Sequence, residues 1–129
     1  MKKNWIFLLI SLLLLGCYSN KNKTEERARE RVTQFVLLIA TEQWEEVEKL
    51  LSSTLMDSEY KEVFLSNFDS WQLKDTTDLI IDIRRIYIPE KDPENRALVS
   101  MNIRSKKHDF TKLVSMPIRY EKGDWYIGS

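Results

Sequence analysis

The sequence predicts an α+β domain in which three helices pack on a curved antiparallel sheet of about four strands. Apolar residues recur at helical spacing as far as Trp71, and from Leu79 onward they alternate with polar residues as in strands. Because the helices precede the strands instead of alternating with them, the pattern favours α+β over a parallel βαβ order. The 129 residues contain no internal repeat and suit one domain, which we place at residues 24–129.

The first seventeen residues, MKKNWIFLLISLLLLGC, have the layout of a secretory signal peptide. Two lysines precede an apolar run from Trp5 to Leu15 that only Ser11 interrupts. A helix needs about 20 apolar residues to cross a bilayer, so this run is short for a membrane span. We therefore expect residues 1–16 to be a cleaved signal peptide.

The end of this run, Leu14-Leu15-Gly16-Cys17, resembles the bacterial lipobox, in which a small residue precedes a cysteine that becomes lipidated. The resemblance implies cleavage between Gly16 and Cys17, a lipid such as palmitate on Cys17, and residues 17–23 as a tether. The expected location is the cell membrane, lipid-anchored, with the domain facing the outside or the periplasm. A plain signal peptide with an unrelated cysteine and an uncleaved anchor remain alternatives.

Three amphipathic patterns predict the helices. The first covers about residues 24–39, where Thr24 is a favourable N-cap. The second covers about Glu42–Ser53, and the third follows Asp57-Ser58. Their apolar positions are Ala28, Val32, Phe35 and Ile39, widened by Leu37 and Leu38; Trp44, Val47, Leu50, Leu51 and Leu55; and Tyr60, Val63, Phe64 and Phe68.

Alternation of apolar and polar residues predicts the strands. The first changes phase at Arg84-Arg85, as a β-bulge would require. The third contains Pro117, which predicts an edge or a bend at that residue. The polar segments Pro89–Asn95 and 106–109 are expected turns. The four predicted strands are Leu79–Ile88, Ala97–Ile103, Phe110–Glu121 and Trp125–Ile127.

Three segments carry a resemblance to a known family: EQWEEVEKLL in the second helix, Arg96-Ala97-Leu98-Val99 in a strand, and Gly-Asp-Trp-Tyr-Ile at residues 123–127. With the order of elements around them, they resemble the nuclear transport factor 2-like superfamily, and in particular small bacterial lipoproteins of unknown function that carry such a domain. The resemblance covers about Glu25 to Ile127. It implies a cone-shaped domain in which a strongly bent sheet wraps around the long first helix. It implies no single function, because this fold carries enzymes, transport adaptors and structural domains alike.

The sequence predicts no catalytic residue, no metal site and no cofactor. Asp82 is the one acid in a strongly apolar strand, and burial there would raise its pKa and suit it to proton transfer. Alternation instead directs it away from Ile81 and Ile83, toward solvent or an arginine. His108 falls in a turn and has no second histidine to help it hold a metal. The three glycines, at positions 16, 123 and 128, form no phosphate-binding loop.

Charge is balanced over the whole chain, with 20 basic and 20 acidic residues, but it is distributed unevenly. Residues 24–70 carry a net charge of −6 and residues 71–129 a net charge of +2. Balanced charge and an export signal both disfavour a nucleic-acid partner. A basic cluster at one end of the sheet is one interpretation, and ordinary surface charge with cross-strand pairs to Asp82 and Glu121 is the other. The basic residues concerned are Arg84, Arg85, Arg104, Lys106 and Lys107.

These observations favour a non-catalytic, lipid-anchored domain that binds a protein partner or a small apolar ligand at the cell envelope. A small isomerase or hydrolase with a pocket in the cone, using Asp82 or a tyrosine, is an alternative. An assembly component of a conjugation or secretion apparatus is another. Five aromatic residues are candidates to line a pocket or an interface, although a core position is the favoured interpretation of each: Trp44, Tyr60, Trp71, Trp125 and Tyr126.

Overall fold

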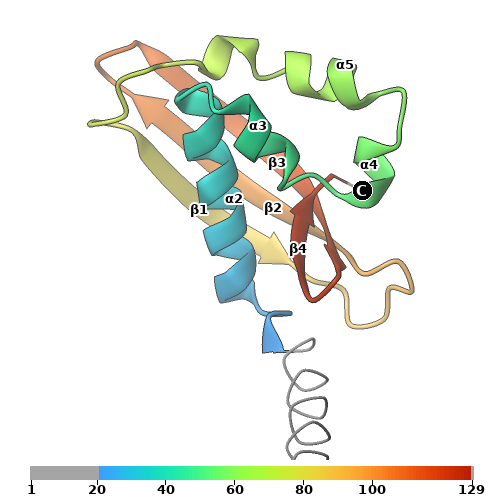
Figure 1. The fold of residues 1–129 in the computed structure, drawn as a ribbon. Coiled ribbons are helices and arrows are strands. Elements are labelled where there is room, and N and C mark those ends of the chain that lie inside the picture. The colour runs from blue at the N-terminus through green and yellow to red at the C-terminus, as the bar shows by residue number, and fades with distance from the viewer. Residues whose placement is uncertain (1–20, 129) are drawn as a thin grey trace, which may run out of the picture.

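The computed structural model describes residues 21–128 and has an α+β architecture (Figure 1). The predicted signal peptide, with Gly16 and Cys17, lies outside the described residues. Within residues 21–128 no helix is long and apolar enough to cross a membrane. The elements, labelled as in Figure 1, are α2 (Glu25–Ala40), α3 (Trp44–Glu48), α4 (Ser53–Met56), α5 (Lys61–Ser66), the 3-10 helix η1 (Asp69–Trp71), β1 (Ile80–Tyr87), β2 (Arg96–Ser105), β3 (Phe110–Glu121) and β4 (Asp124–Ile127).

The four strands form one antiparallel sheet in the order β1-β2-β3-β4, which confirms the predicted sheet of about four strands. The predicted phase change is confirmed as well, because the pairing of β1 with β2 shifts register between Ile83 and Arg85. Arg84 is the extra residue of this bulge. It lets Ile83 and Ile86 both pack toward the core although they are three residues apart.

Pro117 lies in β3 at the point where pairing with β4 ends. Its carbonyl accepts a hydrogen bond from the N–H of Gly128 at 2.8 Å, just past the end of β4. The N–H and C=O of a strand residue point toward the same neighbour. The proline nitrogen therefore faces away from β2, and the missing donor costs no hydrogen bond to that strand. In the sheet order β3 is an inner strand, but β4 pairs only with Ile118–Glu121, so the predicted edge is confirmed for the part of β3 that precedes Pro117.

The core lies between α2 and the sheet (Figure 1). The predicted face of α2 is confirmed, since Val32, Phe35 and Ile39 are fully buried. The expectation that Leu37 widens this face is wrong, because its side chain is 40% exposed. Each residue turns the helix by 100°, so the buried stripe continues through Val36 and Ala40 instead. The sheet meets this stripe with Ala97, Val99, Met101, Ile103, Met116 and Ile118.

The prediction of a single helix over Glu42–Ser53 is wrong. The helix is interrupted because the connecting residues form backbone hydrogen bonds with β4. The N–H of Ile127 donates to the carbonyl of Leu50, and the N–H of Ser52 donates to the carbonyl of Ile127, both at 2.7 Å. Leu51 thereby forms a parallel bridge with Ile127. Ser52 is fully buried, and its hydroxyl accepts from the N–H of Leu55 at 3.2 Å, so it caps α4.

The third predicted helix corresponds to α5, but its apolar face differs from the prediction. Tyr60 and Val63 are 65% and 63% exposed, whereas Leu65 and Phe68 are buried. Phe68 packs edge-on against Phe35 and Trp71, with ring centroids 5.3 and 4.8 Å apart. These aromatic contacts attach the last part of the helical segment to α2.

Candidate functional site

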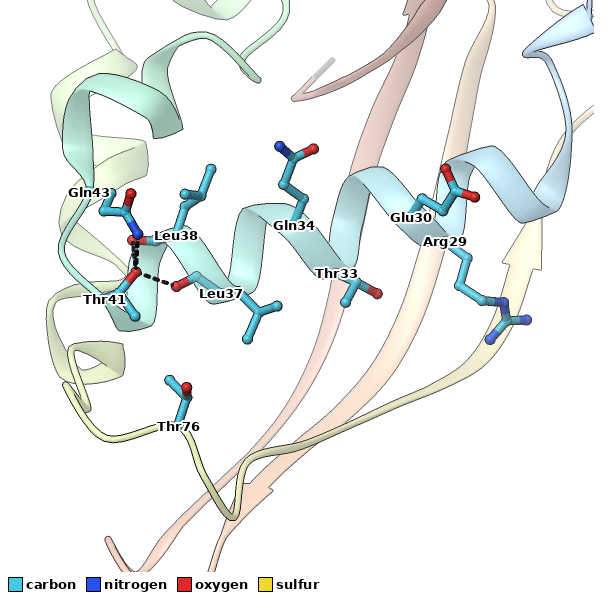
Figure 2. A pocket seen from close by; sticks show the side chains of 9 residues that line it. All are labelled: Arg29, Glu30, Thr33, Gln34, Leu37, Leu38, Thr41, Gln43 and Thr76. Atoms are coloured by element: carbon cyan, nitrogen blue, oxygen red, sulfur yellow. Dashed lines mark hydrogen bonds between the residues drawn. The ribbon is translucent and has the colours of Figure 1, made fainter.

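An open groove of about 670 Å³ runs along the face of α2 that the core does not use. Figure 2 shows its side chains in two rows on the helix, and Thr76, in the loop that precedes β1, lies on the side of the row that contains Leu37. The rows follow the four-residue spacing that places side chains above one another on a helix. They consist of Arg29, Thr33, Leu37 and Thr41, and of Glu30, Gln34 and Leu38; Gln43 closes the end of the groove.

The middle of the groove is apolar and its ends are polar. The half-exposed side chain of Leu37 stands beside Leu38 and the threonines of the first row. At the C-terminal end of α2, the amide of Gln43 donates to the hydroxyl of Thr41 at 2.8 Å, and that hydroxyl donates to the carbonyl of Leu37 at 2.8 Å. Glu30 is the one carboxylate in the lining, and it accepts from Arg27 at 2.9 Å. With neither a histidine nor a second acid in its lining, the groove suits binding better than acid–base chemistry.

A second depression of about 410 Å³ adjoins the groove at the start of α3. The two share Gln43, and the second is lined by Trp44 with the carboxylates of Glu42, Glu45 and Glu46. Glu42 has a positive φ of 58° in the turn that joins α2 to α3. The groove therefore leads from an apolar centre to an acidic end with one aromatic ring beside it.

The five candidate aromatic residues do not form one site. Trp71 and Trp125 are core residues, and Trp125 is fully buried against Tyr120 with ring centroids 5.3 Å apart. Tyr126 lies on β4, and the guanidinium carbon of Arg31 is 5.1 Å from the centroid of its ring. Tyr60 is exposed just before α5. Of the five, Trp44 alone borders the groove end described here.

Asp82 and His108 occupy the positions that alternation and turn chemistry indicate. The side chain of Asp82 is 45% exposed and lies 3.6 Å from Arg84, so it does not sit in an enclosed pocket. The Nε2 atom of His108 is 2.9 Å from the backbone carbonyl of Asp75. Among residues 21–128 no group of three histidine, cysteine or acidic side chains is placed to hold a metal ion.

The five basic residues of the sheet are not gathered in one cluster. Arg84 and Arg85 lie at the bulge in the middle of β1, whereas Arg104 lies at one end of the pairing, opposite Ile80. The expected cross-strand pair of Asp82 is wrong, because Asp82 pairs with Arg84 of its own strand. Glu121 mainly accepts from Ser53, through the N–H at 2.6 Å and the hydroxyl at 3.0 Å.

Lys107 belongs to a polar network that joins the loop before β1 to the β2–β3 turn. Its ammonium group binds Asp75, and this hydrogen bond holds the pKa of that carboxyl well below its usual range. Its backbone N–H donates to Asp78 at 2.8 Å, and the hydroxyl of Ser105 donates to the same carboxylate at 2.6 Å. The hydrogen bond from Ser105 is the main cause of a lowered pKa at Asp78. Lys107 is therefore a structural residue that holds the β2–β3 turn against the loop before β1.

Sequence analysis missed the groove because its residues read as the ordinary exposed face of α2. The available signal was the row of Thr33, Leu37 and Thr41, which places methyl groups four residues apart on the side opposite the core. Comparison with known proteins adds no relative, because no protein-family model, curated protein or solved structure matches this chain.

Proposed function

We propose that this chain is a lipid-anchored extracytoplasmic domain that binds a protein partner along the groove of α2 and catalyses no reaction. The anchor part of the proposal is supported by the sequence from Leu14 to Cys17, with the lipid on Cys17. A cone-shaped, nuclear transport factor 2-like architecture remains part of the proposal. The succession of helices and a four-stranded meander supports it.

The groove is the observation that carries the proposal. Leu37 exposes an apolar side chain on a helix whose other face is already fully used by the core. A protein segment fits this site better than a small apolar ligand inside the domain, because the space between α2 and the sheet is occupied by buried side chains such as Phe35 and Ile103. An open, shallow surface suits a partner that brings its own apolar residues.

Charge indicates the chemistry of the partner. The acidic end of the groove carries Glu42, Glu45 and Glu46, within a helical segment of net charge −6. Opposite charge across an interface steers association and selects partners. We therefore assign to the groove a protein segment with apolar side chains for the region of Leu37 and lysine or arginine side chains for the acidic end.

Site-specific photocrosslinking in the native host tests this proposal. A photoreactive residue in place of Gln34, inside the groove, is expected to give a defined crosslinked product. One in place of Ser115, which is exposed on β3 on the face of the sheet away from the core, is expected to give none. Leu37→Glu should abolish the product. The matched control Leu113→Glu, on a 76% exposed leucine of β3, should leave it unchanged. Crosslinking that ignores the Leu37 substitution would show that the groove is not the binding surface.

A further inference from the structure

Two side chains that precede α2 fasten the chain to the domain. The amide of Asn22 donates to the carbonyl of Gly123 at 2.9 Å, in the turn between β3 and β4. The ammonium group of Lys23 donates to the side-chain oxygen of Asn95 at 2.9 Å and lies 5.9 Å from the ring centroid of Tyr120. The last two residues of the predicted tether thus pack on the folded domain.

The first turns of α2 are fastened to β4 as well. The guanidinium group of Arg27 binds both carboxylate oxygens of Asp124, at 2.9 and 2.6 Å. Arg31 donates to the carbonyl of Trp125 at 2.8 Å. The direction in which the chain enters the domain is therefore set by several charged and neutral hydrogen bonds together.

These contacts define one end of the molecule, which we call the entry end: the start of α2, the β1–β2 loop at residues 88–95 and the β3–β4 turn at residues 122–123. Figure 1 shows these three segments together, with the β2–β3 turn at the opposite end of the sheet. The twelve residues of β3 extend over about 40 Å between the two ends.

We infer that the entry end faces the phospholipid surface and that the β2–β3 turn points away from it. This inference rests on the proposed lipid on Cys17. The five peptide links from Cys17 to Asn22 reach at most about 18 Å when fully extended. That reach is less than half the length of β3, so the lipid and the fastened residues hold the entry end beside the bilayer.

Charge is not what holds the entry end at the membrane. Lys91 and Lys122 are exposed there, but Glu90 and Glu94 are exposed beside them. Mixed charge gives little attraction to anionic lipids. We therefore expect the same orientation on a zwitterionic surface.

Fluorescence quenching on vesicles tests the orientation. Once Cys17 is lipidated, an introduced cysteine is the sole free thiol for labelling, because the chain has one cysteine of its own. Lys91→Cys and Lys106→Cys are matched positions, each an exposed lysine in a turn, one at the entry end and one at the far end. The lipidated full chain is reconstituted in phosphatidylcholine vesicles that contain a headgroup-attached quencher. The label at residue 91 should lose most of its fluorescence, and the label at residue 106 should keep most of it.

Lengthening the tether is the second arm of the experiment. An insertion of twenty glycine and serine residues between Ser19 and Asn20 adds a coil of about 25 Å, which should bring the loss at residue 91 down to that at residue 106. Equal loss at the two positions in vesicle-bound protein without the insertion would overturn the orientation and leave the anchor intact. Full chain that is purified from its native host without a lipid on Cys17, as its intact mass would show, would overturn the anchor, and the orientation with it.

Discussion

Asp124 links the first turns of α2 to β4 through Arg27 and Arg31. Burial opposes ionisation of its carboxyl, but the hydrogen bonds from Arg27 and from the N–H of Trp125 outweigh burial and lower its pKa. Its side chain is 17% exposed, and Arg31 lies 3.6 Å away. Two cations and one anion thus share a half-enclosed site, where charged hydrogen bonds are stronger than at the open surface.

Replacing this carboxylate should destabilise the fold. We expect Asp124→Asn to lower the free energy of unfolding by about 1–3 kcal/mol, because Arg27 and Arg31 lose their charged acceptor. Glu30→Gln is the matched control, since it removes the other carboxylate bound to Arg27, which is 59% exposed, and should cost less than about 0.5 kcal/mol. Urea unfolding measures both variants, and equal losses would contradict the assignment.

Asp78 makes the stability of the domain depend on acid pH. Its pKa is lowered in the folded protein, chiefly by Ser105, relative to about 3.9 in an unfolded chain. A lowered carboxyl pKa stabilises the fold above the unfolded pKa, and the stabilisation is lost as the pH falls through the folded pKa. Urea midpoints should therefore fall below about pH 4, and the fall should be smaller in Asp78→Asn. Parallel pH profiles for the two proteins would contradict this account.

At the scale of elements, the strands were predictable and the short helices were not. Alternation is a local property, so the bulge at Arg84 and the turn at Pro89–Asn95 could be recognised from neighbouring residues alone. The break between α3 and α4 depends on Ile127, which is far away in the sequence and pairs with Leu51. The apolar positions from Trp44 to Leu55 keep helical spacing across that break. Only the adjacent serines at 52 and 53 signalled a new N-terminus there.

The candidate site was harder to predict than the fold. Core residues can be recognised from the periodicity of apolar residues in the sequence. An interface on an exposed helix face cannot, because its composition is close to that of the rest of the protein surface. Two of the candidate aromatic residues, Trp71 and Trp125, instead fill space in the core. The prediction that Leu37 belongs to the core face is wrong, since apolar character alone does not say which neighbour a side chain meets.

The bulge in β1 leads to a prediction about deletions. Removing Arg84 leaves Ile83, Arg85, Ile86 and Tyr87 in unbroken alternation against β2, so this variant should keep the fold with a modest change in Tm. Removing Ser100 from β2 should unfold the domain, because every residue on one side of the deletion then changes face. Circular dichroism during heating distinguishes the two. Equal loss of structure would show that Arg84 has a role beyond the register.

At the scale of the whole molecule, we propose that a lipid on Cys17 determines where the domain works. Replacing Cys17 with Ala removes the one thiol available for lipidation, so the protein should move from the membrane fraction to the soluble fraction. Ser19→Ala, two residues away, is the control and should leave fractionation unchanged. Incorporation of a labelled fatty acid provides a second readout, and its persistence in Cys17→Ala would refute lipidation at this residue.

The bridge between Leu51 and Ile127 also orders events in time. A ribosome delivers residue 51 long before residue 127, and until then the backbone groups of Leu50 and Ser52 have no partner in β4. An emerging chain is therefore free to continue α3 through this segment, as the local sequence favours. The native backbone pairing at the break between α3 and α4 therefore forms only after the last strand is present.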